Sequence, residues 1–278
     1  MMDLSEVRHV VLDMDGTLYR GTRLFAQTLP FLKRLRNLNI GYTFLTNNTS
    51  RSKADHVEKL RSLGIEAQEG EIYTPAESTI GYLRSRLPHV KVVALLGSPS
   101  LCREFERAGF DVTWEKPDAI VVGFDTTLTY ERLCRAAYWI STVLPFLATH
   151  PDFVCPAEGP TILVDCGSVC ACLTAATGRH PVVFGKPDPS ILLELCDRLH
   201  LAPRQLLMVG DRIYTDMKMA WEAGVAAVLV LTGEATAAQA AGLPNQPDLI
   251  VADIGVLGEM LEYARDGRAA VGRSGWRP

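Results

Sequence analysis

Short apolar runs alternate with amphipathic segments along most of the chain. The apolar runs are typical of buried parallel strands, and they cover residues 9–12, 42–45, 72–74, 92–96, 119–122, 146–149, 206–209, 226–231 and 249–251. Segments with apolar residues three or four positions apart lie between them and predict helices, over residues 29–38, 52–63, 75–88, 98–108, 130–142, 168–177, 189–199, 213–223 and 253–263. This alternation predicts an α/β fold with a doubly wound, largely parallel sheet and helices on both faces.

Two carboxylates directly follow the first apolar run, in the sequence Asp13-Met14-Asp15-Gly16-Thr17. Side chains alternate along an extended segment, so Asp13 and Asp15 point the same way from the carboxyl end of a strand. Open α/β sheets bind their ligands at that end. Two like charges so close repel unless a cation or a shared proton relieves them. The motif therefore indicates a divalent metal and a nucleophile–acid pair, with a plain Asp-Gly surface turn as the alternative.

Three further polar signals lie at the ends of predicted strands. Thr46 and Asn47 offer a hydroxyl, an amide and backbone N–H groups to an anionic oxygen, although the pair also suits a simple helix cap. Lys186 lies between Gly185 and Pro187 and is a candidate point charge for a phosphate, with a solvated lysine as the alternative. Asp211 follows the strand 206–209 as a candidate ligand for a hard cation, with Asp216 five positions later.

Composition narrows the class of protein. The chain has 278 residues, is 47% hydrophobic and carries a formal net charge of -4, which gives no electrostatic case for nucleic acid or an anionic membrane as a partner. Its seven cysteines, an odd number in apolar contexts, favour reduced thiols, and no export signal opens the chain, so we expect a cytoplasmic protein. The Gly/Arg-rich tail 266–278 is expected to be loosely ordered.

Cys166, Cys170 and Cys172 form a C-x3-C-x-C cluster. This spacing fits neither common zinc-binding pattern, so we interpret these residues as small buried side chains rather than metal ligands.

Together these motifs resemble the haloacid dehalogenase-like superfamily, and within it the class IIA, 4-nitrophenylphosphatase-like (NagD-type) branch. The resemblance rests on D-x-D-G-T at 13–17, L-T-N-N at 45–48, A-T-x-P-D at 148–152, G-K-P at 185–187 and G-D-R-x-x-T-D at 210–216. It implies a Rossmann-like core, residues 1–80 with 181–278. A large α/β cap, residues 81–180, is then inserted between Thr46 and Lys186, which are 140 positions apart.

The chain departs from the family pattern at two places in the predicted cap. His150 stands where the family usually has Asn, and Asp165-Cys166-Gly167-Ser168 replaces a more glycine-rich stretch. We expect the loop 150–155 to close over the site and select the substrate.

The resemblance implies specific roles for the site residues. Asp13 attacks phosphorus and becomes an aspartyl-phosphate, while Asp15 is the general acid and then the general base. Mg²⁺ is held by Asp13, Asp211 and the Asp15 carbonyl, and Asp216 orients Lys186 or the metal's surroundings. The residues implied to hold the substrate are Thr46, Asn47, Asn48, Lys186 and His150.

The expected activity is hydrolysis of a small-molecule phosphate monoester. A phosphotransferase or mutase would use the same intermediate, and a non-catalytic binding protein on the same fold is a further alternative. Relatives act on sugar phosphates, nucleoside monophosphates and other small esters, so the physiological substrate stays open. Relatives also often form homodimers through the cap.

Overall fold

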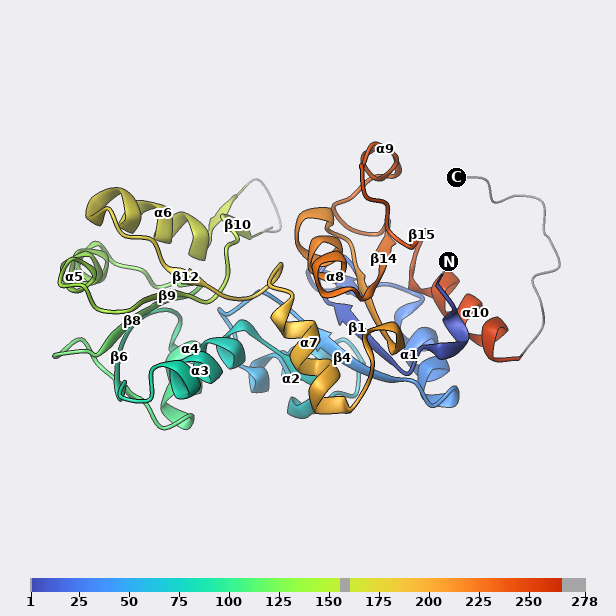
Figure 1. Ribbon diagram of the computed structural model, residues 1–278, viewed down its shortest axis with the longest axis horizontal. Coiled ribbons are helices and arrows are strands. Elements are labelled where there is room, and N and C mark those ends of the chain that lie inside the picture. Colours follow the sequence, from blue (N-terminus) through green and yellow to red (C-terminus); the bar gives the residue numbers. More distant parts are fainter. Residues whose placement is uncertain (1, 156–160, 267–278) are drawn as a thin grey trace. The chain divides into compact units, whose positions relative to one another are not determined.

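The computed structural model describes residues 2–155 and 161–266 (Figure 1). The chain divides into two compact units, Met1–Thr43 with Leu192–Pro278 and Phe44–Ile191. The division predicted at residues 80 and 181 stays a prediction. Of the tail that was expected to be loosely ordered, residues 267–278 lie outside the described residues.

A six-stranded sheet has the strand order β15-β14-β13-β1-β4-β5. Its strands are β1 His9–Asp13, β4 Gly41–Leu45, β5 Ile72–Tyr73, β13 Leu206–Gly210, β14 Ala226–Val230 and β15 Leu249–Val251. Strand β1 pairs in parallel with β13, and β13, β14 and β15 pair in parallel in turn. Every residue of β1 and β13 is buried, as a parallel strand covered on both faces requires. The predicted α/β fold with parallel sheets is confirmed.

Short helices accompany this sheet in the first unit. They are α1 Thr28–Asn37, α7 Ser190–Leu199, α8 Lys218–Ala223, α9 Ala237–Ala241 and α10 Ile254–Arg265, with 3-10 turns at Leu4–Glu6 and Pro203–Gln205 and a small hairpin of β2 Tyr19–Arg20 and β3 Arg23–Leu24. Helix α1 packs against α10, and α8 packs against β14. Asp253 caps α10 by accepting hydrogen bonds from the backbone N–H groups of Gly255 and Val256.

A second sheet, of five strands in the order β12-β9-β8-β6-β7, lies in the second unit. Its strands are β6 Val92–Leu96, β7 Asp111–Val112, β8 Ala119–Val122, β9 Phe146–Ala148 and β12 Val182–Val183. The helices of this unit are α2 Lys53–Ser62, α3 Pro75–Arg86, α4 Pro99–Arg107, α5 Tyr130–Ser141 and α6 Cys166–Thr177, with a 3-10 turn at Glu69–Glu71 and a hairpin of β10 Val154–Cys155 and β11 Leu163–Val164.

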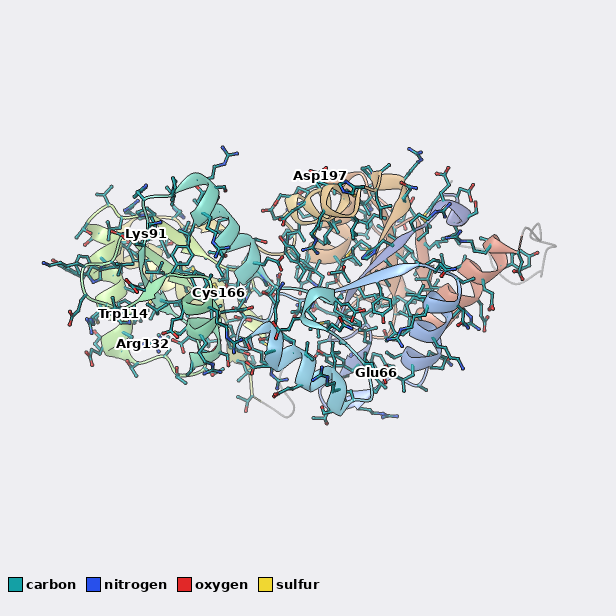
Figure 2. All side chains as sticks on the ribbon, turned by 90° about the horizontal axis from the view of Figure 1, so that it is seen from below. Glu66, Lys91, Trp114, Arg132, Cys166 and Asp197 are labelled. Carbon is teal, nitrogen blue, oxygen red and sulfur yellow. The ribbon has the colours of Figure 1, made fainter. Side chains whose placement is uncertain are left out.

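Alternate residues of the central strands build two separate cores in this unit. Val93 and Leu95 of β6 pack with α3 and α4, whereas Ala94 and Leu96 pack with α5 and α6. Arg132 of α5 donates hydrogen bonds to the carbonyl oxygens of Leu95 and Gly97, which fixes α5 to the end of β6. Figure 2 shows Arg132, Trp114 and Cys166 within this unit.

Most predicted elements are present, with local differences that have physical causes. Helix α6 begins at Cys166, two residues earlier than predicted, because Asp165 caps it. The helix predicted over 213–223 is a π turn at Ile213–Met217 followed by α8. Among residues 2–155 and 161–266, no helix combines the length and the apolar character needed to cross a membrane.

Candidate active site

Three buried carboxylates come together in the first unit. Asp13 ends β1, and Asp211 directly follows the neighbouring strand β13. Asp216 comes from the π turn, which directs it back toward the end of β13. One oxygen from each carboxylate lies within 4.8 Å of the others, and all three residues are buried.

Two glycines allow the backbone to approach these carboxylates closely. A Cβ at Gly233 would lie 1.8 Å from Asp211 Oδ2, and one at Gly210 would lie 2.3 Å from Asp216 Cγ. Neither position has room for a side chain. The backbone therefore forms part of the wall around the carboxylates, which keeps their positions narrowly defined.

The electrostatics of this cluster favour a bound cation. Burial and then the charges of Asp13 and Asp216 raise the pKa of Asp211 to about 8. Asp211 Oδ2 accepts a hydrogen bond of 2.7 Å from the Glu234 N–H. Its Oδ1 is buried and has no hydrogen-bond partner among the described residues. Clustered, like-charged oxygens with an unpaired lone-pair site are the donor set that a hard divalent cation such as Mg²⁺ prefers. The predicted ligands Asp13 and Asp211 thus fit the metal, and Asp216 lies in the same group.

Asp15 differs from the other acids because it is exposed. It forms an isolated bridge with Tyr19, and the Gly16 N–H donates to Tyr19 O at 2.7 Å. Thr17 Oγ1 donates to Asp13 Oδ2 at 3.1 Å. The chain therefore presents one buried and one exposed carboxylate from the same turn, an arrangement that suits a nucleophile next to a group that exchanges protons with water.

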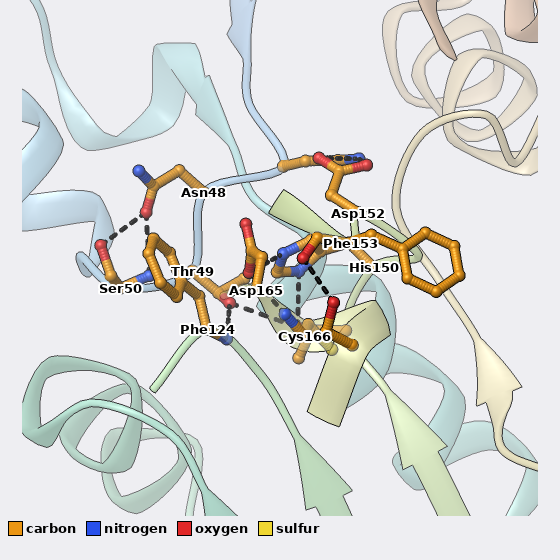
Figure 3. Close-up of polar contacts among 12 residues, drawn as sticks. Asn48, Thr49, Ser50, Phe124, His150, Asp152, Phe153, Asp165 and Cys166 are labelled. Atoms are coloured by element: carbon orange, nitrogen blue, oxygen red, sulfur yellow. Dashed lines mark hydrogen bonds and ion pairs between the residues drawn. The ribbon is translucent and has the colours of Figure 1, made fainter. Parts of the chain in front are cut away.

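Side-chain hydrogen bonds hold the backbone of the loop after β4, in the second unit. Thr46 Oγ1 accepts a hydrogen bond from the Asn48 N–H at 3.1 Å. The Asn48 side-chain oxygen accepts from both the backbone N–H and the hydroxyl of Ser50 (Figure 3). His56 Nε2 lies 3.0 Å from the Asn48 carbonyl oxygen, so this nitrogen carries the proton and donates.

Asn47 and Lys186 are joined directly. Lys186 N–H donates to Asn47 Oδ1 at 2.8 Å, and Asn47 Nδ2 donates to Lys186 O at 3.0 Å. The same amide lies 3.2 and 3.3 Å from the two carboxylate oxygens of Asp152. The Asn47 side chain therefore binds the Lys186 backbone and Asp152 within this unit.

His150 is fully buried, and both of its ring nitrogens have hydrogen-bond partners. Nδ1 lies 2.9 Å from Thr149 Oγ1, and Nε2 lies 2.9 Å from Asp165 Oδ1 (Figure 3). Burial opposes the charged imidazole, but Cys166 and Asp165 outweigh it and raise the pKa of His150 to about 9. The ring expected to contact substrate therefore has no nitrogen to offer in this structure.

His150, Asp152 and Asp165 form the second group in the described residues whose atoms could hold a metal. Since the His150 nitrogens are already hydrogen-bonded, we interpret this group as a buried ion pair. The predicted Cys166, Cys170 and Cys172 cluster contributes to neither group among residues 2–155 and 161–266. Cys166 and Cys170 are buried, whereas Cys172 is exposed, so the three thiols do not share one environment.

Sequence reasoning missed the contributions of His56, Gly233 and Glu234. His56 lies within a charged helix and carries no motif, and Gly233 and Glu234 lie in a loop after a strand with no catalytic signal of its own. Asp152 appeared as part of A-T-x-P-D, but its partner Asn47 is 105 positions away. No local pattern reports such a contact.

Models of known families match both ends of the chain. One described as haloacid dehalogenase-like hydrolase matches residues 10–111, and a second, HAD-hydrolase-like, matches residues 183–257. The 5'-nucleotidase YutF of Bacillus subtilis is 31% identical over 223 residues, which cover 80% of this chain and 86% of that protein. The ribonucleotide monophosphatase NagD of Escherichia coli is 28% identical, over 90% of this chain and 99% of NagD.

The solved structures to which this chain is similar include phosphatases as well. The 4-nitrophenylphosphatase of Thermotoga maritima has a TM-score of 0.88 and 36% identity, over 93% of this chain and 99% of its own. The glycerol phosphate phosphatase of Mycobacterium tuberculosis in complex with magnesium has a TM-score of 0.86 and 29% identity, over 99% and 83% of the two chains. The fold and carboxylate cluster thus define a hydrolase, and the chain belongs to the haloacid dehalogenase-like hydrolases.

Within that family the chain belongs to the class IIA, NagD-type branch. The expectation that it is an enzyme of the phosphatase type is confirmed by these relatives.

Proposed function

We propose that this protein is a Mg²⁺-dependent phosphatase that hydrolyses a small-molecule phosphate monoester through an aspartyl-phosphate on Asp13. The observation that carries the proposal is the buried group of Asp13, Asp211 and Asp216, in which Asp211 Oδ1 has no hydrogen-bond partner among the described residues. Phosphatases among the relatives and solved structures support the same reaction class.

The carboxylates of this cluster divide the chemistry between them. Asp13, Asp211 and the Asp15 carbonyl would hold Mg²⁺, with Asp216 as a further carboxylate beside it. When bound, the cation offsets the charge that keeps a carboxylate and a phosphate dianion apart. Asp13 attacks phosphorus in line and releases the alkoxide or phenoxide, which Asp15 protonates. Asp15 then takes a proton from the water that attacks the aspartyl-phosphate, and inorganic phosphate and free Asp13 result.

The phosphoryl oxygens are held, in this proposal, by the Lys186 ammonium, the Thr46 hydroxyl and backbone N–H groups of the loop 46–48. Because the Asn47 amide is engaged with Lys186 and Asp152, we assign that side chain to holding Lys186 in place. The Asn48 side-chain oxygen is engaged with Ser50 and accepts rather than donates. His150 acts on the loop that carries it rather than on the substrate.

The substrate is tested by measuring phosphate release from a panel of esters with Mg²⁺ present. The panel follows the relatives: nucleoside monophosphates, sugar phosphates, glycerol phosphate and 4-nitrophenyl phosphate. Release from at least one ester, at a rate that follows enzyme concentration, is expected. No release from any ester would contradict the proposal, and transfer of the phosphoryl group to a sugar acceptor at the expense of release would favour the phosphotransferase alternative.

We further propose a cytoplasmic location and a homodimer formed through the predicted cap, residues 81–180. The seven cysteines, an odd number in apolar contexts, suit a reducing compartment. Exposed Tyr130 and Tyr138 on α5, beside a cavity of about 600 Å³ that also borders Trp114 and Trp139, supply apolar surface for a second copy. Light scattering of the purified protein measures the oligomeric state, and a monomer at all concentrations would contradict the dimer.

A further inference from the structure

A buried ion pair lies where β9 leads into its loop and α6 begins. Asp165, the N-cap of α6, accepts hydrogen bonds through Oδ1 from His150 at 2.9 Å and from the Cys166 N–H at 2.6 Å. His150 is 0% exposed and Asp165 is 3% exposed. Breaking such a pair on one side leaves an uncompensated charge in the interior, which is strongly destabilising. The two residues therefore hold each other in one arrangement.

The first turn of α6 also holds the backbone of the loop after His150. The Gly167 N–H donates to Asp152 O at 2.8 Å, and the Asp165 N–H donates to Phe153 O at 3.0 Å. The approach is so close that a Cβ at Gly167 would lie 2.2 Å from Pro151 O. Side chain and backbone thus fix the loop 149–153 to the helix.

The loop fixed in this way carries Asp152 (Figure 3), which is half-buried and accepts hydrogen bonds from the Asn47 amide. Asn47 in turn accepts from the Lys186 N–H and donates to the Lys186 carbonyl. A continuous path of polar contacts therefore runs from α6 through the loop 149–153 and Asn47 to the backbone of Lys186. All of these residues belong to the second unit.

We propose that His150 and Asp165 are positioning residues, whose ion pair sets the loop 149–153 so that Asp152 holds Asn47 and, through it, Lys186. The proposal rests on the proposed function, in which Lys186 binds the phosphoryl group. His150 and Asp165 are in direct contact and act together as one ion pair. Their effect is on the common phosphoryl group, so it is the same for every ester.

Kinetics of four variants test the positioning role. H150N and D165N each remove one partner of the pair, D152A removes the contact to Asn47, and D152N keeps an acceptor for the Asn47 amide. We expect kcat/KM to fall roughly 10- to 100-fold in H150N, D165N and D152A, because displacement of a binding group by about 1 Å costs on that order. D152N should retain most of the activity. The double variant H150N/D152A should lose little more than D152A alone, since the residues act along one path.

Leu173→Ala is the matched control for stability. Leu173 is buried on α6, next to the same core but without a polar contact to the loop. The variant should lower Tm at least as much as H150N and leave kcat/KM unchanged. If H150N and L173A lose stability alike and neither loses kcat/KM, the ion pair serves the fold alone and the proposal is wrong.

Two further measurements separate this inference from the proposed function. The fall in kcat/KM should be the same factor for 4-nitrophenyl phosphate and for the best ester of the panel. A changed ranking of substrates would mean that the loop selects the leaving group, which overturns the proposal. Hydrogen exchange of the Asp165 and Gly167 amides should quicken in H150N but not in D152A. Unchanged hydrogen exchange in H150N refutes the positioning role of the ion pair, whether or not the wild type releases phosphate. A wild type that releases no phosphate would refute the proposed function separately.

Discussion

At the scale of single residues, the Asp211 carboxylate is the physical reason for the cation that we propose in the first unit. Asp211 lies close to Asp13 and Asp216, and its pKa is raised to about 8 by burial and by their charges. A group in this position destabilises the fold when it is ionised and nothing neutralises it. The carboxylates that we propose as metal ligands thus lower the stability of the metal-free fold, and binding of the proposed cation would restore it.

Asp211→Asn should therefore stabilise the protein in the absence of metal while removing the response to Mg²⁺. We expect the Tm of the metal-free variant to rise by about 2–4 °C, the shift that about 1 kcal/mol gives in a large domain. Mg²⁺ should raise the Tm of the wild type but not that of the variant. Thermal scans with and without Mg²⁺ measure both effects, and an equal rise in the two proteins would place the metal elsewhere.

His56 offers a second test with single residues. Its Nε2 donates to the Asn48 carbonyl, and its Nδ1 is buried with no hydrogen-bond partner among the described residues. Burial, which outweighs the contact with Asn48, lowers its pKa to about 4, so the ring is neutral near pH 7. Burying one ring nitrogen without a hydrogen-bond partner costs free energy. We therefore expect that the one hydrogen bond of His56 serves to hold the loop 46–50 in place.

His56→Leu should raise the KM for 4-nitrophenyl phosphate about tenfold, the factor that corresponds to about 1.4 kcal/mol for one lost hydrogen bond. Competitive inhibition by inorganic phosphate should weaken in parallel. His56→Gln retains a donor and is the control, with constants near those of the wild type. Unchanged phosphate inhibition in H56L would show that the Asn48 carbonyl needs no partner.

At the scale of elements, the strongest periodic segments were predictable and the shortest were not. The bounds 92–96, 119–122 and 249–251 agree with β6, β8 and β15 because each apolar run begins directly after a charged residue and ends before a glycine or alanine. Of the two-residue strands, β5 was predicted within residues 72–74, whereas β2, β3, β7, β10, β11 and β12 were missed, since two residues carry no period. Asp13 and Asp211 could be predicted to meet because both end buried strands, whereas the His150–Asp165 pair depends on how α6 packs.

Helices α2, α3 and α4 meet at a half-buried acid whose titration is testable. Glu104 of α4 accepts from the Lys53 N–H of α2 at 3.3 Å, beside the ion pair of Lys53 with Glu77 of α3. Burial raises the pKa of Glu104 from 4.5 to about 7, and Glu77 and Asp55 add to the effect against the opposing influence of Lys53. The folded state therefore binds more protons here than the unfolded state between these two values.

Stability contributed by Glu104 is present below about pH 4.5 and is lost as pH rises through about 7. Glu104→Gln cannot titrate, so its Tm should fall less than that of the wild type between pH 5 and pH 8. Comparing the two proteins cancels the opposite effect of His9 and His56, whose pKa values are lowered to about 4. Parallel Tm curves for the two proteins would contradict the raised pKa of Glu104.

At the scale of the whole molecule, the chain has two compact units, and each contains some of the residues that we propose for the reaction. Asp13, Asp15 and Asp211 belong to the first, whereas Thr46 and Lys186 belong to the second. The chain crosses between the units after Thr43 and after Ile191. The residues proposed for the chemical step and those proposed to hold the phosphate are thus supplied by different parts of the fold.

The proposed role of the carboxylate cluster predicts that phosphate release depends on a divalent cation. Removal of divalent cations by EDTA should abolish phosphate release, and Mg²⁺ in excess should restore it. Ca²⁺ should restore it poorly, because it takes more ligands at longer distances and spoils the in-line geometry at Asp13. Assays of phosphate release across the two metals measure this, and full activity in chelator would exclude the proposed role of the carboxylate cluster.

Asp13→Asn tests the central claim most directly. The substitution removes the charge of the proposed nucleophile and scarcely changes the volume of its side chain, so the fold should survive. A Tm in EDTA that equals or exceeds that of the wild type would show this. In the presence of Mg²⁺ and the best ester, we expect less than about a thousandth of the wild-type kcat, in line with the 10²–10⁴-fold effect of a single catalytic group. A variant that keeps more than that while folding normally would contradict the assignment of Asp13 as the nucleophile.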